Sequence, residues 1–160
     1  MKKMLMSFAT VGALSSSALM LGMMPAPAWA GTPSCASLVG SWGNQLGSTM
    51  NIQSVDPVTG AITGTYRSPS GTSGQQFPLV GWTNTAPAQN GQDNVTLVSF
   101  AVNWGNYGTV TSWSGLCRTQ NQVPTISALW HFAQSNAQFT WSHVQTGQDV
   151  FSPSSSSTAR

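Results

Sequence analysis

The sequence has few charged side chains. Lysine, arginine, aspartate and glutamate together make up 5% of its 160 residues, against about 25% in an average domain. Apart from Lys2 and Lys3 near the N-terminus, three arginines balance three aspartates, so the rest of the chain is formally neutral. Nucleic-acid binding needs a basic surface, and membrane-surface binding needs a basic amphipathic segment. We therefore predict that neither nucleic acid nor a membrane is a partner.

The first 30 residues differ from the rest. Two lysines, an apolar run and the small-x-small ending at residues 28–30 form the pattern of a secretory signal peptide. Pro25 and Pro27 interrupt the apolar run before it reaches the ~20 residues of a membrane span, which makes a membrane anchor the less favoured alternative. We predict cleavage near Ala30 and a secreted or periplasmic protein.

Cysteine is equally scarce. Cys35 and Cys117 are the only two in the chain. Because an exported protein reaches an oxidising compartment, one disulfide is the expected outcome, with two free thiols as the alternative. We predict no metal site.

A helical period is absent from every segment. Short apolar–polar alternations recur instead, separated by clusters of Gly, Asn, Pro and Ser, as in antiparallel all-β domains. We predict eight strands, at residues 37–44, 49–55, 61–67, 76–83, 95–104, 108–117, 124–132 and 140–151.

The connections between these strands are short, with a turn at 56–60 and loops at 68–74 and 84–94. This arrangement favours an all-β fold, an eight-stranded antiparallel up-and-down barrel that closes its own edges and can hold one small ligand. A two-sheet sandwich is the alternative. We place the barrel domain at residues 31–151 and a disordered Ser-rich tail at 152–160.

Three of the predicted strands carry a tryptophan late on their apolar face: Trp104, Trp113 and Trp130. Side chains alternate between the two faces of a strand, so Trp113 shares its face with Thr109 and Thr111. Aliphatic residues normally fill a barrel core, and repeated Trp beside Thr favours a lined cavity instead. That any one of these tryptophans only fills the core is the alternative.

The first predicted hairpin, "GSWGNQLGST" at residues 40–49, has polar groups in an unusual place. Trp42 and Asn44 share one face, and Ser48 follows the turn. An amide and a hydroxyl thus stand where a buried strand normally has apolar side chains. The stretch by itself predicts only a hairpin.

Six blocks of the sequence resemble the avidin and streptavidin family of biotin-binding proteins: "GSWGNQLGST", "TGTYRS", "VNWGN", "TVTSWSGLC", "ISALW" and "TGQDVF". They occur in the family's order and spacing, and they extend from Cys35 to Phe151. The resemblance implies an eight-stranded antiparallel barrel with biotin in one end, assembled as a homotetramer or a dimer. It also implies that the protein sequesters biotin, needs no cofactor and is not an enzyme.

The resemblance assigns roles around the ureido group of biotin. Asn44, Ser48 and Tyr66 would donate hydrogen bonds to the ureido oxygen. Asp149 and Ser68 would accept from the two ureido N–H groups, and a charged acceptor makes the stronger bond. Each buried polar group of the ligand would then meet a partner, which avoids a cost of roughly 1–3 kcal/mol per group.

The remaining ligand contacts are implied in the same way. Thr111 would face the thioether sulfur, and Thr109 would reach the carboxylate. The 68–74 loop would close over the aliphatic tail of the ligand through Gly71, Thr72 and Ser73. The apolar walls would be Trp104, Trp113, Trp130 and Phe132, with Trp141 completing the site of a neighbouring subunit.

The chain combines features of both branches of this family. Avidin pairs cysteines at the positions that match Cys35 and Cys117, whereas streptavidin lacks them, so the resemblance supports the disulfide. The spacing from Trp104 to Trp113 also matches avidin, but "GSWGNQLGST" is closer to streptavidin.

Some positions depart from the family. Gly105 stands where a lysine is common, and His131 and Thr146 stand where apolar residues usually pack between subunits. We expect a tetramer that is weaker than average or pH-sensitive through His131, with a solvated histidine as the alternative. We interpret His143 as a surface residue.

Two other functions are compatible with parts of the sequence. A hydrolase could use the Ser, His and Asp residues, but the chain has no nucleophile elbow and no HExxH pattern. A carbohydrate-binding β-module could use Trp, Asn and Thr, but sugar sites usually lie open on a face, whereas these tryptophans share an inward parity. We predict a binding protein with no catalytic residues.

Overall fold

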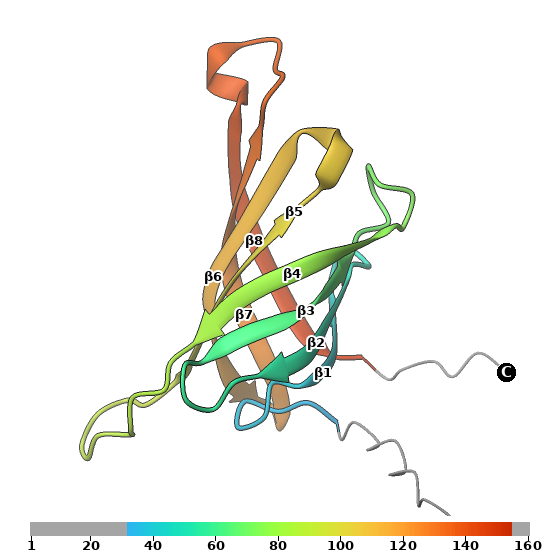
Figure 1. The fold of residues 1–160 in the computed structure, drawn as a ribbon. Helices are drawn as coiled ribbons and strands as arrows, with labels where there is room; N and C mark the ends of the chain where they lie inside the picture. The colour runs from blue at the N-terminus through green and yellow to red at the C-terminus, as the bar shows by residue number, and fades with distance from the viewer. Residues whose placement is uncertain (1–31, 155–160) are drawn as a thin grey trace, which may run out of the picture.

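A computed structural model describes residues 32–154. The eight strands form a closed antiparallel barrel in which each strand pairs with its neighbours in the sequence (Figure 1). Their bounds are β1 (Gly40–Asn44), β2 (Thr49–Val55), β3 (Ala61–Arg67), β4 (Gln76–Thr83), β5 (Thr96–Asn103), β6 (Thr109–Gln120), β7 (Val123–Gln134) and β8 (Val144–Pro153). The predicted all-β barrel is confirmed. The predicted signal peptide and residues 155–160 of the predicted tail lie outside the described residues.

Pairing of the last strand with the first closes the barrel. Asn44 of β1 lies opposite Phe151 of β8, and Trp42 lies opposite Pro153. Closure leaves no unpaired sheet edge, and it distinguishes this barrel from the two-sheet sandwich. β8 therefore continues two residues past its predicted end.

The β6–β7 hairpin is longer than predicted. β6 runs to Gln120 and β7 begins at Val123, with Gln120 and Val123 paired. Asn121 and Gln122 between them both have positive φ, at 48° and 67°, which is the geometry of a two-residue hairpin turn. The predicted strand ends at residues 117 and 124 are wrong, because this tight turn lets pairing continue to its edge.

The predicted start of the last strand at residue 140 is also wrong. The 3₁₀ helix η2 (Thr140–Ser142) occupies this position, and β8 begins at Val144. The Gln134 N–H donates to the His143 carbonyl, and His143 Nδ1 lies 2.8 Å from the Gln134 carbonyl oxygen. His143 is thus half-buried and closes the β7–β8 hairpin, so it is not the surface residue we expected.

One half of the barrel is filled by apolar side chains. The largest of them are less than 2% exposed: Trp42, Met50, Ile52, Ile62, Leu79, Val98, Val102, Ile126 and Phe151. Each such burial contributes about 1.5–3 kcal/mol to the free energy of folding.

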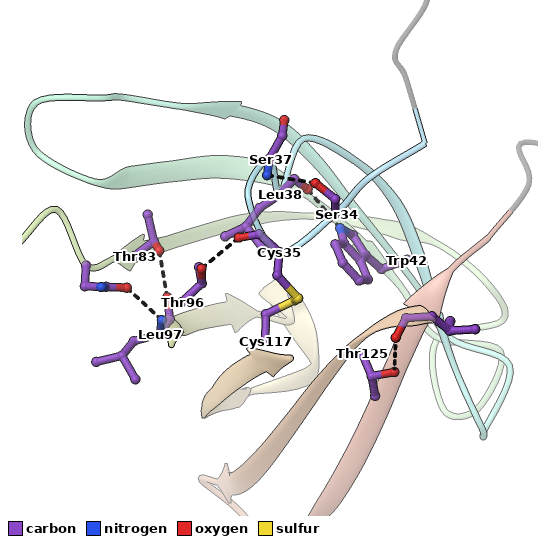
Figure 2. Close-up of a disulfide and its surroundings, with 12 residues drawn as sticks. Ser34, Cys35, Ser37, Leu38, Trp42, Thr83, Thr96, Leu97, Cys117 and Thr125 are labelled. Carbon is purple, nitrogen blue, oxygen red and sulfur yellow. Dashed lines mark hydrogen bonds between the residues drawn. A yellow bond between two sulfur atoms is a disulfide. The ribbon is translucent and has the colours of Figure 1, made fainter. Parts of the chain in front are cut away.

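The segment before β1 is tied to this filled half (Figure 2). Cys35 and Cys117 form a disulfide, as predicted. Trp42 Nε1 donates to the Leu38 carbonyl at 2.9 Å, and Thr96 Oγ1 donates to the Cys35 carbonyl at 2.7 Å. Leu38 is itself buried in the core, so the segment and the strands below it pack as one unit.

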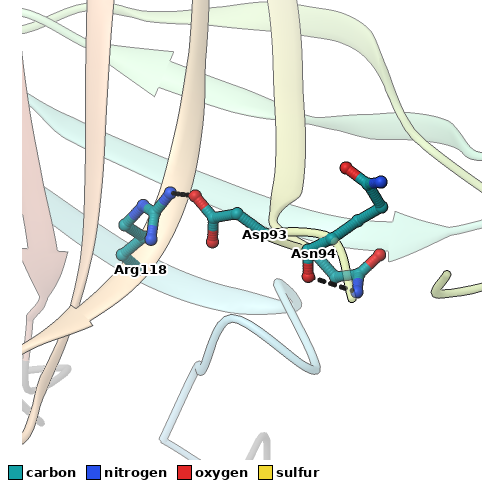
Figure 3. Close-up of polar contacts among 4 residues, drawn as sticks. Asp93, Asn94 and Arg118 are labelled. Atoms are coloured by element: carbon teal, nitrogen blue, oxygen red, sulfur yellow. Dashed lines mark hydrogen bonds and ion pairs between the residues drawn. The ribbon is translucent and has the colours of Figure 1, made fainter. Parts of the chain in front are cut away.

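On the outside of the barrel near this disulfide, Arg118 and Asp93 form an exposed ion pair (Figure 3). The hydrogen bond and charge of Arg118 lower the pKa of the Asp93 carboxyl. This is the one ion pair formed within residues 32–154. No helix within residues 32–154 is long and apolar enough to cross a membrane.

Candidate functional site

The other half of the barrel encloses a cavity of about 430 Å³. Four connections lie at this end of the barrel: the β1–β2 turn, the β3–β4 loop, the β5–β6 connection with the 3₁₀ helix η1 (Gly105–Tyr107) and the β7–β8 connection with η2 (Figure 1). Most of the predicted site residues line the cavity: Asn44, Ser48, Tyr66, Ser68, Gly71, Thr72, Trp104, Thr109, Thr111, Trp113, Trp130, Phe132 and Asp149. Ser73 and Trp141 do not line the cavity of their own chain.

The β1–β2 turn fixes the side chain of Asn44. Its Oδ1 accepts the backbone N–H groups of Leu46 at 3.1 Å and Ser48 at 2.8 Å. The amide nitrogen is therefore directed away from the turn and lies 3.5 Å from the Tyr66 hydroxyl. An asparagine at this point of the hairpin both closes the turn and presents a donor to the cavity.

Tyr66 stands beside this donor with its ring in the aromatic core. The ring stacks on Trp113 with centroids 5.0 Å apart and lies edge-on to Trp104 at 5.8 Å. Burial raises the pKa of the Tyr66 phenol, the hydrogen bond with Ser48 opposes this shift, and the negative charge of Asp149 raises the pKa further. The phenol consequently keeps its proton at neutral pH and remains a hydrogen-bond donor.

Asp149 is the one acidic side chain of the cavity, and it is 3% exposed. Its Oδ2 accepts from Trp113 Nε1 at 2.8 Å, and its Oδ1 accepts from Gln45 Nε2 at 3.2 Å. Gln45 in turn accepts the Val150 N–H at 2.9 Å, which holds its amide in place. Neutral donors thus position this carboxylate, and lone pairs remain for a ligand N–H.

Two wall tryptophans are oriented by specific neighbours. Trp104 Nε1 donates to Thr111 Oγ1 at 2.8 Å, so the Thr111 hydroxyl keeps its own proton for another contact. Trp130 lies directly opposite Gly147, where a Cβ atom would come within 2.3 Å of the indole ring. The glycine of the "TGQDVF" block therefore makes room for the Trp130 wall.

The β3–β4 loop contributes hydroxyl groups to the cavity mouth. The Ser68 hydroxyl lies 3.3 Å from both the carbonyl and the hydroxyl oxygen of Ser70, and Thr72 Oγ1 donates to the Ser68 carbonyl at 3.0 Å. These bonds hold Thr72 against the loop's own backbone. Ser73 has a positive φ of 50° and is exposed outside the cavity.

Four further residues line the cavity that the sequence did not identify: Leu46, Ser70, Tyr107 and Gln145. Leu46, Ser70 and Tyr107 belong to connections, where no alternation marks the inward side. Gln145 could have been found, because it lies an even number of residues from Asp149 on the same strand and so has the same parity.

Trp141 lies in η2 and is 77% exposed. Its ring stacks on Phe139 with centroids 4.8 Å apart and an interplanar angle of 3°. Figure 1 shows the β7–β8 hairpin, which carries both rings, projecting beyond the neighbouring strands. Within residues 32–154, these two rings form no aromatic pair except with each other, and both are exposed.

Comparisons with known proteins agree with this architecture. The sequence pattern of the Avidin family matches residues 32–154. Afifavidin from Afifella pfennigii is 32% identical over 126 residues, which cover 76% of this chain and 70% of that protein. The crystal structure of Xenavidin superposes with a TM-score of 0.62 at 25% identity, over 75% of this chain and 99% of that chain. With a family match over the whole described barrel and a relative at this level of identity, the chain belongs to the avidin family.

Proposed function

We propose that the protein binds biotin non-covalently in the barrel cavity. The observation that carries the proposal is the set of polar groups at one end: the donors of Asn44, Ser48 and Tyr66 line the same cavity as the carboxylate of Asp149. A cyclic urea needs donors for its oxygen and acceptors for its N–H groups, and this end of the cavity offers both. The oriented Asn44 amide and the protonated Tyr66 phenol support the donor roles.

The other ligand groups have partners of suitable chemistry. The Thr111 hydroxyl still has its own proton to donate, which supports a contact with the thioether sulfur. The Ser68 hydroxyl can accept a hydrogen bond from the second ureido N–H. Thr109 and the β3–β4 loop, with Gly71, Thr72 and Ser73, would meet the tail and its carboxylate. Trp104, Trp113, Trp130 and Phe132 would exclude water from the bicyclic head.

Tight binding is expected because the site is ordered before the ligand arrives. Every buried side-chain N or O atom within residues 32–154 has a hydrogen-bond partner, and the strands hold these groups in a closed barrel. Little side-chain freedom remains to be lost on binding, which reduces the entropic cost of association. We propose that the protein binds biotin to sequester it, without a cofactor and without catalysis. Consistent with this, neither His131 nor His143 lines the cavity.

We further propose that the protein is a homo-oligomer, most simply a tetramer, with a dimer as the alternative. The outward face of β4–β8 exposes large apolar side chains, among them Trp82 and Leu129 at about 60% exposure. Its ionisable groups are limited to His131 and Arg118 in the described strands. Such a face is typical of a surface that a second copy covers.

Trp141 would then complete the site of a neighbouring subunit, which accounts for an exposed aromatic residue at the tip of a projecting hairpin. Trp141→Lys is expected to speed biotin release and to lower the oligomeric mass together. Light scattering and a release assay on the same sample measure both. No effect on either would contradict a site shared between subunits.

We propose that the protein acts outside the cytoplasm, in the periplasm or as a secreted protein. The Cys35–Cys117 disulfide supports an oxidising compartment. The signal-peptide pattern at residues 1–30 also supports export from the cytoplasm.

A thermal melt with and without biotin tests the proposed function. Ligand that binds only the folded state, at about 1,000 times its Kd, adds about 4 kcal/mol to the free energy of unfolding. The midpoint should rise by about 10 °C or more. An unchanged midpoint at saturating biotin would overturn the assignment.

A further inference from the structure

No positively charged side chain lines the cavity. Asp149 is the only charged residue among those that line the cavity. The described chain has two arginines, and neither lines the cavity: Arg118 pairs with Asp93 on the outside of the barrel, and Arg67 is exposed and lies against Gly74 of the β3–β4 loop. Gly105, at the start of η1, has a φ of 59° and adds no side chain. A ligand with a carboxylate tail therefore meets only neutral partners here.

Gln145 is the polar side chain of β8 nearest to this mouth. It shares the inward parity of Asp149 and lies four residues before it, which is about 13 Å along the strand. In the register of the sheet it pairs with Phe132, which itself pairs with Thr111. The Gln145 side chain lines the cavity, is exposed to solvent, and forms no side-chain hydrogen bond within residues 32–154. Both its N–H donors and its carbonyl acceptor are thus available to a ligand.

The space beyond the mouth is also open. A second hollow of about 400 Å³ begins at Trp104 and Tyr107, which it shares with the cavity, and continues past Gln75, Phe77 and Asn106. The Phe77 ring lies edge-on to both Trp104 and Tyr107, at 5.2 and 6.1 Å. A tail that continues past the cavity has aromatic and amide surface to lie on.

From these three observations we propose that Gln145 determines the specificity of the site for the ligand's tail, and that it favours biotin joined through an amide over the free acid. This inference rests on the proposed function. An amide presents one C=O acceptor and one N–H donor, which match the donor and acceptor of Gln145, whereas a carboxylate can use only the donor. The free acid also brings a negative charge into a cavity whose only charged lining residue is the carboxylate of Asp149. The natural ligand would then include biotinyl-lysine, free or within a peptide.

Release of biotin and of biocytin, the amide of biotin with lysine, tests this inference on the purified full-length protein. Each ligand is loaded in labelled form and its release is followed after an excess of unlabelled biotin is added. The wild type should release biocytin no faster than biotin. One net hydrogen bond corresponds to about a fivefold change in rate, so Gln145→Leu should raise the ratio of biocytin to biotin release about fivefold.

A second variant, Gln145→Glu, keeps the size of the side chain and adds a negative charge, so it distinguishes the effect of chemistry from the effect of shape. Gln145→Glu should shift the ratio the other way, about three- to tenfold, because a carboxylate repels the free acid and still accepts from the amide N–H. Gln120→Leu is the matched control, since Gln120 is an exposed glutamine at the end of β6 that lies away from the cavity. It should leave the ratio unchanged.

The outcomes distinguish this inference from the proposed function. If the wild type retains neither ligand, the biotin assignment itself fails. If it retains both and neither Gln145 variant changes the ratio, or the wild type releases biocytin many times faster than biotin, the role of Gln145 is overturned and the biotin assignment stands.

Discussion

The same strands build two different halves of one barrel. Along β8 the inward side chains change from Phe151, which is fully buried, to Asp149 and then Gln145. Along β2 the inward side chains are Ile52 and Met50, and Ser48 continues the same parity just before the strand begins. The filled half contributes stability through apolar burial, whereas the open half holds polar groups, among them Asn44 and Asp149, that hydrogen bonds from the protein hold in place. One end of such a strand therefore contributes to stability and the other end to ligand recognition. Mutations in the filled half should change stability, and mutations in the open half should change binding.

The largest expected effect is on the stability of the filled half. Cys35→Ala with Cys117→Ala removes a disulfide that joins residues 82 apart in the sequence. The loss of this cross-link should lower the free energy of unfolding by about 4 kcal/mol, because the unfolded chain gains conformational freedom. Urea unfolding measures the loss. The rate of biotin release should stay within about twofold of the wild type. The disulfide lies far from the cavity, and changes at distant sites with no shared partners have nearly independent effects.

The control for this variant is Arg118→Gln, which breaks the exposed ion pair beside the disulfide. An exposed pair contributes little to stability, so the urea midpoint should not shift measurably. A large loss in this control, or a disulfide variant that keeps its stability and loses biotin, would contradict the division between the two halves.

The next largest effect is on binding in the open half. Asp149→Asn keeps the shape of the side chain and an oxygen for Trp113 Nε1, but it removes the charge and one acceptor. A hydrogen bond to a charged group contributes about 1.5–3 kcal/mol, so biotin affinity should fall about ten- to a hundredfold. Competition against a labelled ligand measures the change. A variant with unaltered affinity would show that Asp149 does not meet the ureido group.

A smaller effect should appear in the pH dependence of stability. The pKa of the buried Tyr66 phenol is raised in the folded protein, so above about pH 10 the unfolded chain loses this proton while the folded chain keeps it. The free energy of unfolding should be unaffected by Tyr66 below pH 9 and should fall above pH 10, by at most about 1.4 kcal/mol per pH unit. Urea titrations of wild type and Tyr66→Phe at pH 9 and pH 11 check this. If the free energy of unfolding of Tyr66→Phe falls as steeply between pH 9 and pH 11 as that of the wild type, the Tyr66 phenol is not the group responsible.

The filled half and the strand order could be predicted from the sequence, because alternation and turn residues are local signals. The bounds of β2, β3 and β4 agree with prediction, since Gly- and Pro-rich connections limit these strands on both sides. β8 was predicted to begin too early because residues 140–143 contain the apolar Trp141, and alternation cannot distinguish a strand from a projecting aromatic turn.

The cavity could be predicted only in part. Its strand residues follow from parity and from the family's motifs, whereas Tyr107 and Ser70 lie in connections whose direction depends on tertiary contacts. The supporting roles of Gln45 and Gly147 also depend on register, because each acts on a side chain of another strand. A single sequence carries no local signal for such a pairing.

The most direct test of the central claim, that the open half of the barrel is a preorganised biotin site, is a calorimetric titration of the purified protein with biotin. The account predicts saturation at one biotin per chain for the wild type, with weaker binding at the same stoichiometry for Asp149→Asn. The absence of any heat of binding for the wild type would contradict this account. So would an Asp149→Asn variant that binds biotin with the same affinity as the wild type.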